Sequence, residues 1–280
     1  MTASQTLPDV RDGLTSLQRV ALRAVASAGP TLTRSSRIVA NAASRKPHFE
    51  RPDLYGAIVS QATAWTLRYP LVEGSGDFGS ADGDEPAAAP FTEVRVGTVA
   101  TALLSELDDP APEGIIPLDR RASSIILPGP FPHLLANGAR TGTSLFPPHN
   151  LTEVCAAIVA RIDDPTIDVV GLLAHLTGPD FPSGGTIVDD GSLRTIYETG
   201  KGTLRVRDED GEERSVQVSM TGTLEGEERT FTLVELIDEY VAHRREVIVR
   251  RDQQERRAAE LDADDEAAPR ALLTESAVTG

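Results

Sequence analysis

The apolar residues in the first 65 positions recur at the spacing of helices, in three short segments. The pattern predicts helices over residues 14–28, 33–43 and 52–65, and Gly29-Pro30 ends the first of them. The second segment carries the basic side chains of Arg34 and Arg37. Three short helices that include basic residues are typical of helix-turn-helix and winged-helix units. We therefore expect a DNA-binding unit of this kind at the start of the chain.

Strand-like and helical patterns alternate through the rest of the chain. The predicted elements are strands over 66–74, 94–99 and 123–132 and helices over 151–163 and 167–176. Further on, Asp210-Gly211 favours a two-residue hairpin turn between two strands, and residues 231–261 form one long helical pattern. Mixed helices and strands without an internal repeat predict an α+β fold.

The charge of the chain is unevenly distributed. The 280 residues carry a formal net charge of −16, but residues 1–69 hold nine Lys and Arg against four Asp and Glu, a local +5. The remaining residues hold 18 cations against 39 anions, which is −21. An acidic surface repels nucleic acid and anionic membrane, whereas a basic segment attracts phosphate. We therefore expect any DNA contact to lie in the N-terminal unit, and we expect no membrane partner.

The cysteine content favours a reducing compartment. Cys155 is the single cysteine, so no disulfide can form within the chain. Its neighbours in EVCAAIVARI are apolar, which predicts a small buried side chain rather than a reactive thiol. No apolar run approaches the ~20 residues that cross a bilayer, and the N-terminus lacks the pattern of a signal peptide. We expect a cytoplasmic protein.

A G-x-G-x-x-G spacing at Gly74, Gly76 and Gly79 lacks the other features of a dinucleotide site. Such a site needs a helix directly after the glycines, so that the pyrophosphate meets the helix N-terminus. Here the chain continues through SADGDEP, whose three carboxylates would face the phosphate. We predict instead an exposed loop with glycines at positive φ. The three acids are expected to be solvated, and the five histidines show no ligand spacing, so no metal site is expected.

Several specific stretches occur in an order that indicates a family. They include YPLVEGSGDFGS, PPHNLTEV, GPDFPSGG and YETGKGTLRVR, which begin at residues 69, 147, 178 and 197. Residues 7–257 resemble the breakage-reunion region of the type IIA DNA topoisomerase A subunits, which are the A subunits of DNA gyrase and topoisomerase IV. The resemblance implies an isomerase family that changes DNA topology with the help of ATP.

The resemblance also implies an organisation in four parts. These are a winged-helix region at 1–100, a reduced tower-like α/β region at 101–230, a long helix from a coiled coil at 231–262 and a disordered acidic tail at 263–280. The chain ends soon after HRREVIVRR, so we expect it to lack the exit gate and the DNA-wrapping domain of the family.

Cofactors and partners follow from the same resemblance. The family works as a homodimer with a B subunit that supplies the ATPase and the Mg²⁺-binding domain, so no cofactor is expected in this chain. The expected partners are DNA, bound weakly, and a gyrase or topoisomerase IV A or B subunit. A second copy of this chain is a further expected partner.

Phe91 and Pro90 occupy the catalytic positions that the resemblance implies. In the family, the tyrosine of an Arg-Tyr-Thr-Glu segment attacks a DNA phosphate, and the preceding arginine helps to stabilise the charge. This chain has Pro90-Phe91-Thr92-Glu93 instead. Phenylalanine has no hydroxyl to form a phosphotyrosyl bond, and proline has no guanidinium. We therefore predict no catalytic residue.

Eight cationic or ionisable side chains remain as candidates for DNA contacts. They are Arg11, Arg19, Arg34, Arg37, Arg45, Lys46, His48 and Arg68. Each phosphate contact adds to non-specific affinity through the release of counterions. The first-helix segment TSLQRV keeps one of the family's four cationic or ionisable side chains, so the expected affinity for duplex DNA is weak.

Three functions are open on these observations. The first is a DNA-binding or topoisomerase-regulating relative that cannot cleave DNA, which the loss of the nucleophile favours. The second is an active ATP-dependent topoisomerase of the A-subunit type, which the family resemblance alone would imply. The third is a protein repurposed to bind something other than DNA. Salt-dependent DNA binding separates the first from the third, and cleavage complexes trapped by detergent would identify the second.

Overall fold

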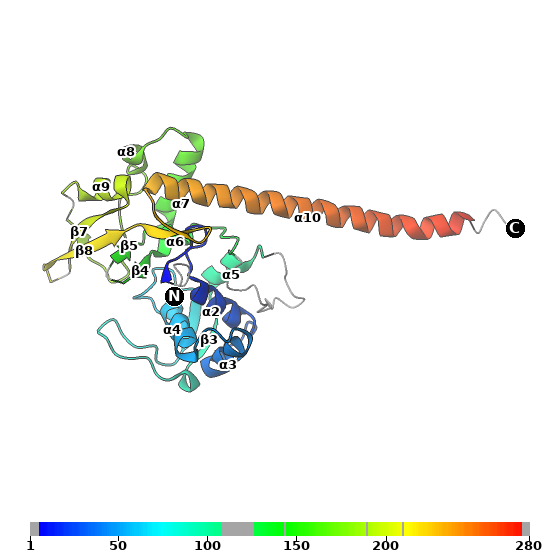
Figure 1. Cartoon of the computed structure of the whole chain (residues 1–280), viewed down its shortest axis with the longest axis horizontal. Helices are drawn as coiled ribbons and strands as arrows, with labels where there is room; N and C mark the ends of the chain where they lie inside the picture. The colour runs from blue at the N-terminus through cyan, green and yellow to red at the C-terminus, as the bar shows by residue number, and fades with distance from the viewer. Residues whose placement is uncertain (1–5, 108–125, 143, 189, 209, 276–280) are drawn as a thin grey trace. The chain divides into compact units, whose positions relative to one another are not determined.

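A computed structural model of the chain describes residues 6–107, 126–142, 144–188, 190–208 and 210–275, the side chains of Thr141 and 257–275 excepted. The chain forms two units, Met1–Val241 and Ala242–Gly280 (Figure 1). One long helix, α10 (Leu233–Glu275), begins in the first unit and makes up most of the second. Within these described ranges, no helix combines the length and apolar character needed to cross a bilayer.

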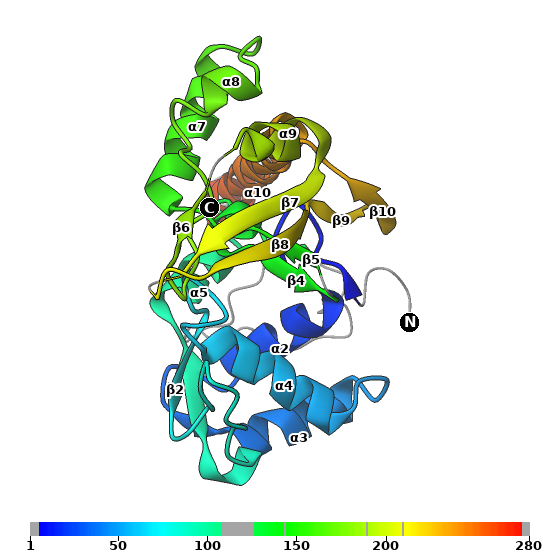
Figure 2. The same ribbon diagram turned by 90° about the vertical axis from the view of Figure 1, so that its left-hand side faces the viewer.

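Three helices and a three-stranded sheet build the first hydrophobic core. The helices are α2 (Ser16–Ala26), α3 (Ser35–Arg45) and α4 (Arg51–Ala62), which Figure 2 shows grouped with β2. The antiparallel sheet has the order β1 (Thr33–Arg34), β3 (Glu93–Val96) and β2 (Val72–Ser75). A short 3₁₀ turn, η1 (Ala89–Phe91), precedes β3, and α5 (Thr98–Leu104) follows it.

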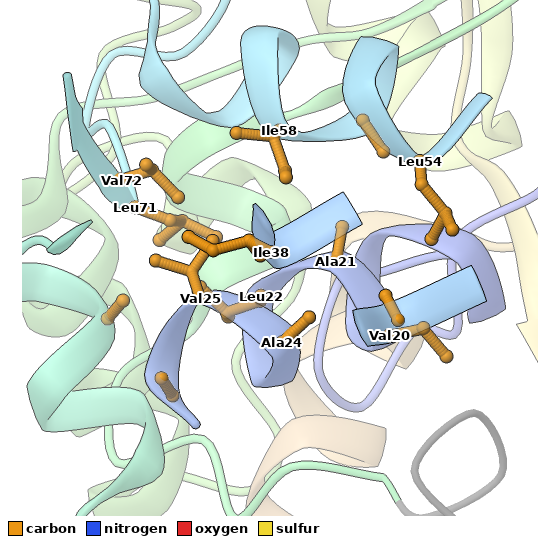
Figure 3. Packing of buried hydrophobic residues seen from close by; sticks show 14 of the residues in the cluster. Val20, Ala21, Leu22, Ala24, Val25, Ile38, Leu54, Ile58, Leu71 and Val72 are labelled. Carbon is orange, nitrogen blue, oxygen red and sulfur yellow. The ribbon is translucent and has the colours of Figure 1, made fainter. Parts of the chain in front are cut away.

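Local sequence explains where α2 begins and what it buries. The Thr15 side chain accepts a hydrogen bond from the Gln18 backbone N–H, and the Gln18 side chain accepts one from the Thr15 backbone N–H. This reciprocal capping box satisfies two N–H groups at the helix start. Figure 3 shows Val20 of α2 and Leu54 and Ile58 of α4 among the side chains of the core. Each such buried side chain contributes about 1.5–3 kcal/mol.

A five-stranded sheet and several helices build the second hydrophobic core. The sheet has the order β4 (Ala139–Thr141), β5 (Ser144–Phe146), β8 (Glu213–Ser219), β7 (Lys201–Arg207) and β6 (Thr186–Ile187). Only the β5–β8 pair within it is parallel. The helices are α6 (His133–Asn137), α7 (Leu151–Asp163), α8 (Val169–Leu172), α9 (Ser192–Thr199) and the start of α10. A separate hairpin pairs β9 (Thr221–Leu224) with β10 (Glu227–Thr230).

The N-terminal segment contributes to both cores. Val10 lies in the second core, whereas Leu14, four residues later, lies in the first. The Val10 backbone N–H donates to the Thr223 carbonyl at 3.0 Å, and the Thr223 N–H donates to the Pro8 carbonyl at 2.8 Å. The start of the chain therefore pairs with β9, about 200 residues away in sequence.

Asn137 and Tyr69 form a second connection between the cores. The Tyr69 backbone N–H donates to Asn137 Oδ1 at 2.7 Å, and Asn137 Nδ2 donates to the Tyr69 carbonyl at 2.9 Å. The Tyr69 hydroxyl in turn accepts a hydrogen bond from the Leu151 N–H at 2.9 Å, at the start of α7. One amide side chain thus satisfies both backbone groups of Tyr69, as a neighbouring strand would.

Most predicted helices are confirmed. α2, α3, α4 and α7 lie within the ranges predicted for them or differ by a few residues, and the long helix is present. The mixture of helices and strands confirms the α+β class. The first core extends beyond the boundary expected at residue 100, because Leu103, Leu104 and Leu127 also belong to it.

Three predicted elements are shorter than expected or form no regular structure in the described residues. Residues 126–132 form no strand, since three prolines in that stretch remove ladder donors, and the rest of the predicted strand lies outside the described residues. The predicted helix at 167–176 is reduced to α8 and following turns, because Gly171 weakens helix propagation. The predicted strand at 66–74 is also limited to its end, where β2 begins at Val72.

Two other segments are longer than expected. The β7–β8 connection runs from Asp208 to Glu212 rather than over two residues, and the Asp208 side chain accepts the Glu212 N–H at 2.8 Å. The long helix continues through Glu275, whereas the sequence predicts disorder from residue 263. Residues 263–275 hold four Ala, two Leu and two Glu, which favour helix even where the net charge is acidic.

Candidate nucleic-acid interface

The glycine-rich loop returns the chain to η1 rather than opening a helix. The Ala87 backbone N–H donates to the Asp77 carbonyl at 3.1 Å and closes the loop. Gly76 has a φ of 111°, and a Cβ atom on it would lie 2.9 Å from the Phe91 carbonyl oxygen. Only glycine permits that approach in that conformation. The prediction of a loop with glycines at positive φ is therefore confirmed for Gly76 and Gly79, whereas Gly74 lies in β2 without a positive φ.

Phe91 ends η1 with its side chain in solvent. The side chain is 77% exposed, although a phenyl ring is normally buried. Pro90, directly before it, lies within the same 3₁₀ turn and is also exposed. The turn therefore presents an apolar aromatic ring on the surface, without a neighbouring polar side chain on its N-terminal side.

A hydroxyl network holds η1 against the start of α3. The Ser35 backbone N–H donates to the Thr92 carbonyl at 3.0 Å, and the Thr92 hydroxyl donates to Ser35 Oγ at 2.8 Å. The Tyr55 hydroxyl donates to the Ala87 carbonyl at 2.6 Å and lies 3.0 Å from Thr92 Oγ1. Ser35 and Thr92 are buried, so these bonds are shielded from water and fix the backbone on both sides of Phe91.

Arg34 and Arg37 lie exposed beside this turn. Arg34 pairs with Glu93 across the β1–β3 ladder, and Arg37 lies in the first turn of α3. Neither arginine side chain makes an ion pair with any residue that the structure describes. With Leu32 and their neighbours they line a hollow of about 450 Å³. The first turn of α3 contains no acidic residue, so the helix dipole adds to the positive potential there.

Arg45 and His48 lie on the surface near the end of α3. Arg45 donates from Nε to Asn41 Oδ1 at 3.0 Å, one helical turn earlier. The His48 ring lies 4.2 Å from the Phe49 ring, centroid to centroid, and remains exposed. Both side chains can reach solvent, so they remain available for contact with an anion.

Arg19 and Lys46 are buried, contrary to the prediction that they contact DNA. Arg19 is 3% exposed, and its Nε lies 2.6 Å from Asp12 Oδ2, because α2 is covered on almost all sides. Lys46 is 4% exposed at the C-cap of α3. A phosphate cannot reach either cation without disrupting the first core.

Arg11 and Arg68 are engaged in ion pairs. Arg11 Nε lies 2.9 Å from Asp9 Oδ1, and this hydrogen bond raises the pKa of Arg11 although partial burial opposes it. Arg68 lies 2.7 Å from Asp180 and over the ring of Tyr69. Of the eight candidates, the structure therefore brings Arg34 and Arg37 together beside Phe91 and places Arg45 and His48 on the surface near the other end of α3.

His133 and His149 are buried and make hydrogen bonds within the fold. His133 Nδ1 contacts the Asp12 carbonyl at 3.0 Å, and His149 contacts the Leu135 carbonyl at 2.8 Å and the Tyr197 hydroxyl at 2.6 Å. Burial lowers the pKa of each histidine to about 4. Within the described residues, no group of three or more His, Cys, Asp or Glu side chains is arranged to hold a metal ion.

Cys155 is exposed on α7, which contradicts the prediction of a buried side chain. The apolar residues of α7 turned to the core are Val154, Ala157 and Ile158, and Cys155 falls outside that face of the helix. Partial desolvation raises the pKa of its thiol, so no activated thiolate is formed.

Comparison with known proteins decides the family. Residues 5–218 match the family model that describes the A subunits of DNA gyrase and topoisomerase IV. The match covers well over half of the 280 residues. The chain belongs to the DNA gyrase/topoisomerase IV A-subunit family.

The curated relatives include DNA gyrase A subunits of several organisms. The chain is 40% identical to the DNA gyrase A subunit of Deinococcus deserti over 214 residues, which are 72% of this chain and 26% of the relative. It is 38% identical to that of Thermotoga maritima, over 72% of this chain and 26% of the relative. The corresponding figures for Staphylococcus aureus are 37%, 73% and 24%. The chain thus spans about a quarter of the length of these relatives.

For a gyrase A-like chain, the hydroxyl network around η1 was the feature that sequence reasoning missed. Tyr55, Ser35 and Thr92 are separated by 20 to 57 residues in sequence, so no local spacing relates them. The signal available in the sequence was Thr92, directly after Phe91. A threonine hydroxyl that becomes buried needs a hydrogen-bond partner, and that bond fixes the backbone next to Phe91.

Proposed function

We propose that this chain is a DNA-binding member of the gyrase A family that does not cleave DNA and that regulates a topoisomerase. In this proposal, α2, α3, α4 and the β1-β3-β2 sheet form a winged-helix DNA-binding unit. The region around the five-stranded sheet is the reduced tower. DNA and an A or B subunit of gyrase or topoisomerase IV are the proposed partners.

The observation that carries the proposal is the exposed phenyl ring of Phe91. Phe91 follows the glycine loop at the position where the family resemblance expects the nucleophilic tyrosine, and its side chain is 77% exposed. The ring is thus accessible to DNA, as a nucleophile must be. Without a hydroxyl it cannot attack phosphorus, and Pro90 cannot donate hydrogen bonds to a developing oxyanion.

The tyrosine hydroxyls of neighbouring elements do not replace the missing one. The Tyr55 hydroxyl donates to the Ala87 carbonyl, and the Tyr69 hydroxyl accepts from the Leu151 N–H. The Tyr197 hydroxyl is buried against His149, and burial raises its pKa. Each of these hydroxyls makes a hydrogen bond within the fold. This supports the proposal that DNA cleavage was lost, rather than that another tyrosine became the nucleophile.

Arg34 and Arg37 support the retention of DNA binding. Both are exposed, near the positive end of α3, and on the part of the chain with a local excess of cations. Such groups bind phosphates non-specifically and release counterions. Because four of the eight candidate side chains are buried or paired, we expect the affinity to be low at physiological salt.

The test is the binding of a short duplex DNA across a salt series. The proteins are the wild type, Arg34→Ala/Arg37→Ala, and the matched control Arg194→Ala/Arg214→Ala, which removes the same charge from exposed positions in the second core region. We expect binding that weakens with salt, with the slope of log K against log salt reduced by about 1.8 in the first variant, at ~0.9 per lost phosphate contact. The control should keep the wild-type slope.

Two results would favour the other two functions, a protein repurposed away from DNA and an active topoisomerase. Absence of binding at low salt would indicate a protein repurposed away from DNA. Covalent protein–DNA complexes trapped by detergent, in the presence of the B partner, ATP and Mg²⁺, would indicate an active topoisomerase. Regulation is tested by adding the chain to an active gyrase and measuring supercoiling, which should decrease in proportion to the chain added.

A further inference from the structure

Phe91 lies in a surface setting that combines apolar and cationic groups. Leu32, at 43% exposed, lines the hollow of about 450 Å³ with Arg34 and Arg37, and β1 leads directly from it to the pairing with β3. A large apolar side chain as exposed as that of Phe91 can mark a contact surface. Guanidinium groups beside them favour an anionic partner with apolar, planar parts.

We propose that Phe91 is a stacking platform for an unpaired nucleobase, so that the chain binds DNA at gaps and single-stranded stretches in preference to intact duplex. This inference rests on the proposed function, since it takes DNA as the ligand. It adds that the ring at the former catalytic position has a binding role of its own. Nucleobases stack on exposed aromatic rings independently of their sequence, while nearby cations bind the backbone.

The ring is held in place before any ligand binds. The bonds between Ser35 and Thr92 fix the residue after Phe91, and the bond from Tyr55 to the Ala87 carbonyl fixes the segment before it. Phe91 itself closes η1 with a hydrogen bond from its N–H to the Ala88 carbonyl at 2.8 Å. A fixed backbone lowers the ordering cost of binding.

The arginines lie within reach of the same nucleotide strand. Arg34 is opposite Glu93 in the ladder, and Glu93 is two residues from Phe91, or ~7 Å of strand. One short stretch of DNA can therefore stack a base on Phe91 and place phosphates near Arg34 and Arg37. Glu93 and the four carboxylates of the loop at 77–87 repel phosphate, so the DNA backbone is expected on the α3 side of the ring.

An intact duplex does not offer the same contact. Its bases are stacked on both faces, and unstacking one costs a few kcal/mol, whereas a base at a gap or in a single strand is already free. Stacking on an aromatic side chain changes affinity by roughly 5- to 140-fold per base, which is ~1–3 kcal/mol at ~1.4 kcal/mol per tenfold. This is enough to produce a measurable preference.

The experiment compares three labelled DNAs of one sequence by fluorescence anisotropy: an intact duplex, a duplex with a short gap, and the single strand. The proteins are the wild type, Phe91→Ala, Phe91→Leu and Phe91→Trp, each checked for an unchanged thermal unfolding temperature. We expect the wild type to bind the gapped and single-stranded DNAs at least fivefold more tightly than the duplex. Phe91→Ala and Phe91→Leu should lose that preference while Phe91→Trp keeps it, because leucine is apolar but has no aromatic face.

The outcomes separate this inference from the proposed function. Equal binding of gapped and intact DNA by the wild type, or a full preference in Phe91→Leu, would overturn the stacking role and leave DNA binding intact. No binding of any of the three DNAs would overturn the proposed function as well. A fluorescent 2-aminopurine placed in the gap should be quenched by the wild type and by Phe91→Trp, and not by Phe91→Leu.

Discussion

Arg19 and Asp12 form an ion pair inside the first core, with 2.6 Å between Arg19 Nε and Asp12 Oδ2 and neither side chain more than 4% exposed. Arg19 also donates to the Leu14 carbonyl at 2.7 Å, and Asp12 accepts the Leu127 N–H at 2.9 Å. A cation that the sequence suggested for DNA instead binds α2 to the segment directly before it, and Asp12 of that segment holds Leu127.

Replacing Arg19 with alanine should therefore destabilise the fold strongly. The change leaves Asp12 buried without its partner, which costs about 3–5 kcal/mol. Urea unfolding, followed by circular dichroism, measures the loss in the free energy of unfolding. Arg194→Ala, at an exposed position, is the control and should change stability by less than about 0.5 kcal/mol. A loss below about 1 kcal/mol for Arg19→Ala would contradict the buried pair.

Replacing Tyr55 with phenylalanine should loosen the backbone around Phe91. The Ala87 carbonyl loses its donor, at a cost of about 0.5–1.5 kcal/mol, and the preference for gapped DNA should fall while duplex binding is unchanged. Tyr69→Phe removes a hydroxyl elsewhere and serves as the control in the same anisotropy assay. The role assigned to the network fails if both variants alter the gap preference equally.

Replacing Asn137 with alanine should weaken the connection between the two cores. Both backbone groups of Tyr69 lose their partner, at about 1–3 kcal/mol for each buried group left unsatisfied. Asn41→Ala on the exposed side of α3 is the matched control. Hydrogen exchange of the Tyr69 amide should accelerate in the first variant only, and an unchanged rate there would argue against the contact.

The stability of the fold should fall as the pH is lowered from about 6.5 to about 4. Burial lowers the pKa of His133 and of His149 to about 4, so the unfolded chain takes up protons in this range that the folded chain does not bind. Each of the two histidines should lower the free energy of unfolding by roughly 3 kcal/mol between pH 6.5 and pH 4. Urea unfolding at several pH values measures this dependence. In His149→Gln the free energy of unfolding should change less with pH, whatever the stability of that variant at pH 8. An unchanged pH dependence would contradict a lowered pKa for His149 in the folded chain.

Cleavage should require a hydroxyl at position 91. With the B partner, ATP and Mg²⁺, the wild type should form no covalent complex with DNA, whereas Phe91→Tyr/Pro90→Arg should form one that detergent traps. Phe91→Tyr/Pro90→Ala tests whether the arginine is needed. Complex formation by the wild type would refute the proposal that this chain does not cleave DNA.

The sequence could predict the longer helices because their pattern is local. α7 has the predicted bounds, since Asn150 caps it by accepting the Thr152 and Glu153 N–H groups. β1 could not be predicted in the same way. It is two residues long and exists through its pairing with β3, about 60 residues further on.

The site was predictable in its chemistry and only partly in its geometry. Phe91 and the exposed Arg34 and Arg37 follow from motif and charge. The burial of Arg19 depends on tertiary contacts, although one signal was present. Residues 19–26 are apolar on nearly every side of α2 apart from Arg19 and Arg23, so a helix packed on all sides must bury some of that charge.

The pairing of Val10 with Thr223 has a consequence for synthesis on the ribosome. Val10 leaves the ribosome early, but its partner strand is translated more than 200 residues later, or roughly 10–40 s at ~5–20 residues per second. The first core can assemble while residues 8–10 still lack their partners in β9. The second core cannot close until nearly the whole first unit has emerged, so the nascent chain must keep its leading segment from pairing with other strands for most of its own translation.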